Sequence, residues 1–106
     1  MKIAFNVFPL KSAHKNRGIG YYTQNLLEAL KGDKTLDILE FTDISEVRGV
    51  DAIHYPWFDF FFHSLPLKRS FPTVVTVHDV IPLKFSKHYS VGIKGRFNLF
   101  LQRWAL

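Results

Sequence analysis

The sequence predicts a domain of the α/β class, with a mostly parallel sheet and flanking helices. Three observations lead to this prediction. Short apolar runs that suit buried strands recur along the chain, a segment with helical spacing comes after the first run and a short loop, and a second helical segment closes the sequence. The chain has 106 residues, of which 47% are hydrophobic and 22% charged, so it is long enough for one core and too apolar to be disordered.

The first apolar run and the segment after it form a βα unit. Residues 3–8 are apolar and the run ends at Pro9, which is typical of a buried strand, and residues 9–18 make a polar, basic loop. From Gly18 the apolar residues recur at spacings of three and four, as on one buried helix face, until Gly32 and Asp33 end the helix. The apolar positions of that face are Ile19, Tyr22, Leu26, Leu27 and Leu30.

Three more strands and a final helix complete the order. We expect strands at residues 35–42, 50–55 and 73–78, and the β-branched density of the last one predicts a central parallel strand. After a loop at 79–90, a helix carries the apolar stripe Phe97, Phe100, Leu101 and Trp104. This order indicates a Rossmann-like sheet. Because the last helical pattern reaches Leu106 without a stop signal, we expect residues 1–106 to be an incomplete domain of a longer protein.

Composition narrows the functional classes. The absence of cysteine excludes a disulfide framework, a thiolate zinc site and a cysteine nucleophile. No apolar stretch is long enough to span a bilayer and no secretory signal is visible, which favours a cytoplasmic location. Residues 1–65 carry seven basic and eight acidic side chains, whereas residues 66–106 carry seven basic and one acidic. Such a basic half can face nucleic acid, anionic lipid or phosphorylated substrates.

The first candidate site is the turn that contains Arg17, Gly18 and Gly20. A glycine turn between a strand and a helix presents backbone N–H groups and a positive dipole end to a phosphate. The dinucleotide fingerprint would need a third glycine where Thr23 stands, and the Gly-Lys-Ser/Thr ending of a P-loop is absent. Two glycines also suit a tight βα connection without any ligand, so both interpretations remain open.

The second candidate is the pair His78 and Asp79, at the expected carboxyl end of the strand 73–78. A histidine there can hydrogen-bond a substrate near neutral pH. Asp79 could instead cap a helix or form a turn, or the pair could hold a metal. No other histidine lies at a metal-ligand spacing on a helix, so we predict no metal site.

The third candidate is the segment 54–59, which lies at the carboxyl end of the expected strand 50–55 and mixes aromatic and polar residues. Tyr55 and Asp59 suit the binding of a sugar ring or a base, whereas the phenylalanines here are expected to pack a satellite core. The basic C-terminal helix could lie on an anionic membrane surface or cover the sheet. No recognition motif for nucleic acid accompanies its charge, so we expect no nucleic-acid partner.

Three segments resemble a known family in their residues and their order. They are 16–30 (NRGIGYYTQNLLEAL), 51–56 (DAIHYP) and 72–82 (PTVVTVHDVIP). Together they are similar to the N-terminal domain of retaining glycosyltransferases of family four, the GT-B mannosyltransferase-like group. The likeness continues to residues 101–106 and covers essentially the whole chain.

The resemblance implies an enzyme with two Rossmann-like domains, of which this chain would be part of the first, acceptor-side one. A glycine at the position of Gly18 lets backbone amides approach the donor phosphates, with Gly20, Arg17 and Asp79 as further substrate-binding candidates. The histidine at the position of His78 lies beside the transferred sugar and is the expected catalytic residue. Asn16, Tyr55 and Asp59 are the acceptor-side candidates.

The expected parent reaction transfers a hexose from a GDP- or UDP-sugar to an acceptor with retention of configuration. The acceptor would be a sugar or glycan, including lipid-linked ones, and the absent second domain would hold the donor. No tightly bound cofactor is expected, because helix N–H groups can stabilise the leaving diphosphate without a metal. The alternative is a non-catalytic α/β module that binds a phosphorylated ligand or an acidic partner. Contact with the inner face of an anionic membrane is a further expectation for the basic half.

Overall fold

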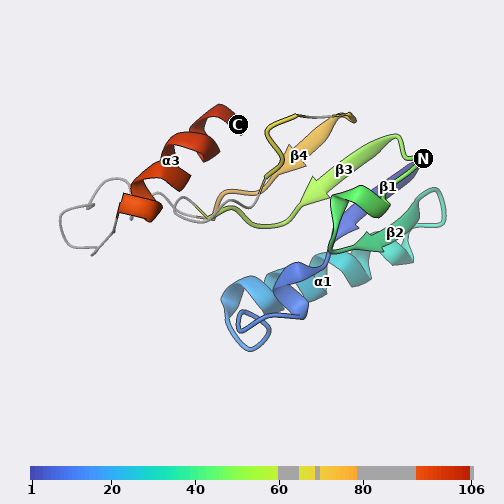
Figure 1. Ribbon diagram of the computed structural model, residues 1–106. Coiled ribbons are helices and arrows are strands. Elements are labelled where there is room, and N and C mark those ends of the chain that lie inside the picture. The colour runs from blue at the N-terminus through green and yellow to red at the C-terminus, as the bar shows by residue number, and fades with distance from the viewer. Residues whose placement is uncertain (60–64, 69, 79–92, 106) are drawn as a thin grey trace. The chain divides into compact units, whose positions relative to one another are not determined.

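The computed structural model describes residues 1–59, 65–68, 70–78 and 93–105, which form two compact units (Figure 1). The first unit contains Met1–Trp57 and Ser70–Thr76, and the second contains Phe58–Arg69 and Val77–Leu106. The first unit holds a four-stranded, all-parallel sheet with flanking helices, so the predicted α/β, Rossmann-like fold is confirmed.

The sheet has the strand order β2-β1-β3-β4. Its strands are β1 (Lys2–Asn6), β2 (Asp37–Phe41), β3 (Ala52–Tyr55) and β4 (Thr73–Val75). In the register, Asn6 pairs with Phe41, Phe5 with His54, and Tyr55 with Val75. The strands therefore end together along one side of the sheet, which we call the carboxyl edge. This is the side on which open α/β sheets bind ligands.

One expectation about the sheet is wrong. The segment 73–78 was expected to be the central strand, but β4 pairs only with β3 among the described residues, and β1 and β3 are the inner strands. Val74 is 57% exposed accordingly. β-branched residues favour any pleated strand, whereas the order of strands is set by the connections between them, so the composition of a strand does not reveal its place.

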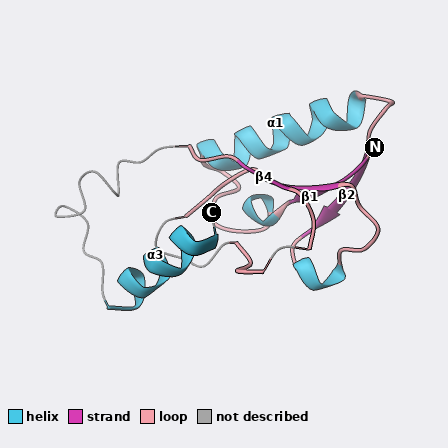
Figure 2. Ribbon diagram, turned by 90° about the horizontal axis from the view of Figure 1, so that it is seen from above, coloured by secondary structure: helices cyan, strands magenta, loops and turns pink. Residues whose placement is uncertain are grey.

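The helix α1 (Gly18–Gly32) has the expected bounds and packs on one face of the sheet (Figures 1 and 2). Leu27 joins Phe5 and Val7 in a buried cluster that Leu26 and Leu30 extend. Fully buried Thr23 satisfies its hydroxyl by donating to the carbonyl of Ile19 at 2.7 Å. Tyr22, expected on the buried face, lies at its border with 37% exposure.

A short 3-10 helix, η2 (Ile44–Glu46), follows β2, and the carboxylate of Asp43 before it accepts a hydrogen bond from the backbone N–H of Ser45 at 2.9 Å. The side chains of Phe41 in β2 and Tyr55 in β3 meet edge to face across the intervening strand β1, with ring centroids 5.8 Å apart. After η2, Gly49 adopts a φ of 62°, which a residue with a side chain rarely takes. A second 3-10 helix, η1 (Phe8–Leu10), follows β1, where the sequence had suggested that the strand continued to Phe8.

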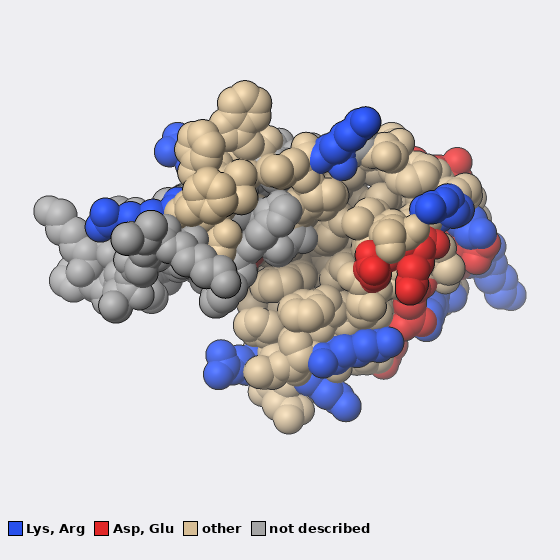
Figure 3. Space-filling model, viewed as in Figure 1, with Lys and Arg blue, Asp and Glu red and all other residues tan. Residues whose placement is uncertain are grey.

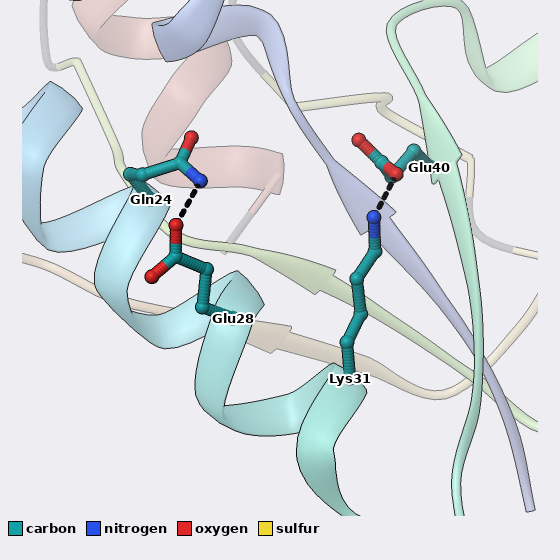
Figure 4. Close-up of polar contacts among 4 residues, drawn as sticks. All are labelled: Gln24, Glu28, Lys31 and Glu40. Carbon is teal, nitrogen blue, oxygen red and sulfur yellow. Dashed lines mark hydrogen bonds and ion pairs between the residues drawn. The ribbon is translucent and has the colours of Figure 1, made fainter.

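Two polar contacts lie on the exposed side of α1, and one of them joins the helix to the sheet. Gln24 donates to Glu28 at 2.7 Å, and Lys31 near the helix end forms an ion pair with Glu40 of β2 (Figure 4). Both partners of the ion pair are more than 40% exposed, so it contributes at most about 1 kcal/mol. The chain then turns at Asp33, whose carboxylate accepts hydrogen bonds from the hydroxyl and the backbone N–H of Thr35, and these lower the pKa of Asp33.

The second unit contains the helix α3 (Ile93–Ala105), which confirms the C-terminal helix. Three residues of its expected apolar stripe are exposed, namely Phe97, Phe100 and Trp104, at 59%, 58% and 75%. Phe58 and Leu65 are buried. The expected loop at 79–90 and the phenylalanines at 60–62 lie outside the described residues.

Truncating the centre of the α1 face should destabilise the first unit. We expect Leu27→Ala to lower the free energy of unfolding by about 2–5 kcal/mol, because it removes a side chain that is 3% exposed and packed on Phe5. The exposed Asn25→Ala variant on the same helix is the control and should change it by less than about 0.5 kcal/mol. Urea unfolding followed by circular dichroism measures both, and equal losses would contradict the assigned core.

Candidate functional site

Four segments meet at the carboxyl edge of the first unit. They are the loop 7–17 after β1, the first turn of α1, the residues that follow β3 and the residue that follows β4. The placement comes from the parallel register, because every parallel strand delivers the chain to the same side of the sheet. Polar, basic and aromatic side chains occupy these segments, so this edge is the candidate site.

In the first turn of α1, the space beside Gly18 is empty and the space beside Gly20 is filled by backbone. Arg17 occupies the N-cap position in an extended conformation and its side chain makes no capping hydrogen bond, so it leaves the first helical N–H groups uncapped. A Cβ at Gly18 would meet nothing within 4 Å, whereas a Cβ at Gly20 would collide with the backbone carbonyls of His14 and Lys15. Gly18 thus leaves space for a ligand. Gly20 is required by the close approach of the loop.

Positive charge gathers around this helix start. Lys11, Lys15 and Arg17 are exposed, and residues 1–27 contain no aspartate or glutamate. On the face drawn in Figure 3, only Lys and Arg side chains stand at the lower left, where α1 begins, while the acidic side chains lie at the right together with further Lys and Arg. The charge and the helix dipole act in the same direction and favour an anion.

An aromatic cluster joins the loop to the end of β3. Trp57, which is 8% exposed, stacks on Phe8 with ring centroids 5.5 Å apart and an interplanar angle of 17°. The ring of His14 lies against the same indole at 5.4 Å. These contacts attach the loop 7–17 to Trp57 at two points, Phe8 and His14. Phe8 keeps 42% of its surface exposed and offers an aromatic face at this edge.

A polar cluster lies on the α1 side of the sheet between β3 and β4. The Nε2 atom of His54 is 3.1 Å from the hydroxyl of Thr76, and the hydroxyl of Tyr22 is 3.4 Å from the same Thr76 oxygen. The imidazole of His54 also stands edge to face against Phe5, with centroids 5.2 Å apart. Burial lowers the pKa of His54 below its ordinary value, so the ring is neutral at pH 7.

Sequence reasoning missed this cluster. Thr76 and Tyr22 were assigned to a strand and to a buried helix face, and His54 stood in a motif without a role of its own. Tyr22 lies 54 positions before Thr76 in the sequence, and His54 lies 22 positions before it. The local spacing of residues cannot reveal contacts over such separations. The available signal was the alternation of β3, which places His54 on the face opposite Tyr55.

The remaining candidates fall in different places. Tyr55 is 3% exposed in the core, where burial raises its pKa, and its packing on Phe41 accounts for an aromatic residue there. Asn16 is exposed in the basic loop. His78 is exposed and Asp59 half-buried, and both belong to the second unit, so a meeting of Gly18 with His78 stays a prediction. Asp79 lies outside the described residues.

The described residues contain no group of three or more His, Cys, Asp or Glu side chains that could hold a metal ion. Within the same ranges, no helix has both the length and the apolar character needed to cross a membrane. Comparisons of the chain with protein-family models, with curated proteins and with solved structures find no match.

The two glycines of α1 should respond differently to the same substitution. We expect Gly20→Ala to lower the free energy of unfolding by about 1–3 kcal/mol, because its methyl group would strike rigid backbone. Gly18→Ala should leave it unchanged or slightly raised, since the site is open and alanine favours a helix. Thermal unfolding of both variants measures this. A stable Gly20→Ala variant would show that the loop does not pack as described.

Protonation of His54 should oppose folding. Its folded-state pKa lies below the unfolded value of about 6.5, so the unfolded chain binds more protons just below that pH. The free energy of unfolding should therefore fall as the pH drops through about 6.5. In His54→Gln this part of the pH dependence should disappear. An NMR titration of the imidazole gives the pKa directly, and a value above 6.5 would contradict the burial described.

Proposed function

We propose that this chain is the acceptor-side part of a retaining GT-B glycosyltransferase of family four. The parent enzyme would transfer a hexose from a GDP- or UDP-sugar to a sugar or glycan acceptor. One observation carries the proposal. The three segments that resemble the family are far apart in sequence, yet the helix start at Gly18 and the ends of β3 and β4 lie along one carboxyl edge. A transferase cleft needs this gathering of motifs on one rim.

The residues of the edge suit the chemistry of the proposed reaction. Departure of a nucleoside diphosphate leaves negative charge, which the open N–H groups at Gly18 and the cation of Arg17 are suited to stabilise. His78 would hydrogen-bond the transferred sugar as its bond to the diphosphate breaks. Asn16 and Asp59 would contact the acceptor. The donor nucleotide would be held by a domain outside these 106 residues, so the chain alone should transfer no sugar.

A second candidate function is a module that binds a phosphorylated ligand without catalysis. The observation that favours it is the run of exposed cations at Lys11, Lys15 and Arg17 beside an uncapped helix start. Such a module would bind inorganic phosphate or a sugar phosphate through the first unit alone. It would show no turnover of nucleotide sugars in any longer form of the protein.

The decisive experiment uses the natural gene product that contains this chain. We expect it to release nucleoside diphosphate from a GDP- or UDP-hexose and to form a product whose anomeric configuration, read by NMR, matches that of the donor. His78→Ala should lower kcat at least 100-fold, as the loss of a group that acts on the reacting sugar. The Val77→Ala control changes an exposed neighbour and should keep near full activity.

One result would contradict the proposal as a whole, and a second would contradict only the role of His78. A product of inverted configuration would exclude a retaining enzyme. Full turnover by His78→Ala would show that this histidine is not catalytic. The family assignment would then rest on the other two segments.

A further inference from the structure

Thr76 is the meeting point of three elements at the carboxyl edge. Its backbone N–H donates to the carbonyl of Tyr55 at 2.9 Å, which continues the pairing of β3 with β4 by one residue. Its hydroxyl is bonded both to His54 of β3 and to Tyr22 of α1. The side chain is thereby fixed by the sheet and the helix together, on an edge where it remains half-buried rather than sealed.

The hydroxyl of Thr76 has capacity for one more hydrogen bond. A threonine hydroxyl has one proton to donate and two lone pairs to accept, and the two partners use two of these three positions. The three side chains are themselves neutral at pH 7, since Thr76 and Tyr22 carry hydroxyls and burial lowers the pKa of His54 below its ordinary value. Neutral groups that both donate and accept match a ligand hydroxyl, whereas a phosphate oxygen only accepts.

We propose that Thr76, Tyr22 and His54 form a hydroxyl-binding subsite that takes a neutral pyranose ring. The exposed part of Phe8, stacked on Trp57 at the same edge, adds the aromatic surface that the apolar face of a sugar ring favours. This deepens the proposed function, on which it rests for the statement that the ring belongs to the acceptor. The binding itself requires only the first unit, so it can be measured on the 106-residue chain.

The test is an NMR titration of the 106-residue chain with methyl α-D-mannopyranoside. We expect the backbone amide signals of Thr76 and Tyr22 to shift with the sugar concentration. Thr76→Val and Tyr22→Phe each remove one hydroxyl oxygen at nearly constant shape and should raise Kd at least fivefold. Tyr21→Phe is the matched control, because it removes the same atom from the adjacent residue of α1, which is 62% exposed, and should leave Kd unchanged.

Several outcomes would overturn the subsite. They are the absence of shifts at Thr76 and Tyr22, equal Kd values for Tyr21→Phe and Tyr22→Phe, and a response of these amides to inorganic phosphate but not to the sugar. Thr76→Ser keeps the hydroxyl and should retain binding, which separates a lost hydrogen bond from a disturbed fold. If Thr76→Val does not fold, Tyr22→Phe decides, since it changes one atom of a partly exposed side chain.

Kinetics of the natural gene product separate this inference from the proposed function. Tyr22→Phe should raise KM for the acceptor at least fivefold with little change in kcat, while hydrolysis of the nucleotide sugar without acceptor stays unchanged. Sugar transfer with an unaltered acceptor KM would overturn the subsite alone. Sugar binding at Thr76 in a protein that transfers no sugar would overturn the proposed function and leave the subsite in place.

Discussion

Phe5 joins the core of the first unit to its carboxyl edge. The side chain is completely buried in β1, where it packs with Leu27 of α1 and receives the imidazole of His54 edge-on. Its place follows from the parallel register, which sets Phe5 and His54 side by side on the face that the helix covers. The same side chain that packs against α1 therefore also positions the histidine that contacts Thr76. Core and site share one side chain.

The basic loop gives different roles to the two glycines in the first turn of α1, Gly18 and Gly20. Trp57 contacts the loop through Phe8 and His14. The backbone carbonyls of the loop at residues 14 and 15 lie so close to Gly20 that a side chain there would collide with them. One glycine of the pair is thus accounted for by the fold. Gly18 has no such neighbour, and the cations around it lie exposed. The open position and the charge point to a ligand more directly than the glycine pair itself does.

The sequence was sufficient for features that local physics determines. The bounds of α1 follow from the apolar spacing between Gly18 and Gly32, and each expected strand of the sheet is present with shorter ends. The position of β4 in the sheet could not be predicted, because it depends on how connections cross and not on the residues of the strand. The contacts of Thr76 were out of reach for the same reason, since its partners His54 and Tyr22 belong to other elements. The requirement for glycine at position 20 could not be predicted either, because it arises from the close approach of the preceding loop.

The absence of acidic side chains from residues 1–27 has a kinetic consequence. Lys11, Lys15 and Arg17 create a field that extends into solvent by about the Debye length, roughly 8 Å at physiological ionic strength. An anion that diffuses nearby is drawn toward this end of the unit before any hydrogen bond forms, and added salt shortens that reach. For negatively charged molecules, the loop therefore governs the rate of encounter, while the neutral side chains beside Thr76 govern how long a hydroxyl stays.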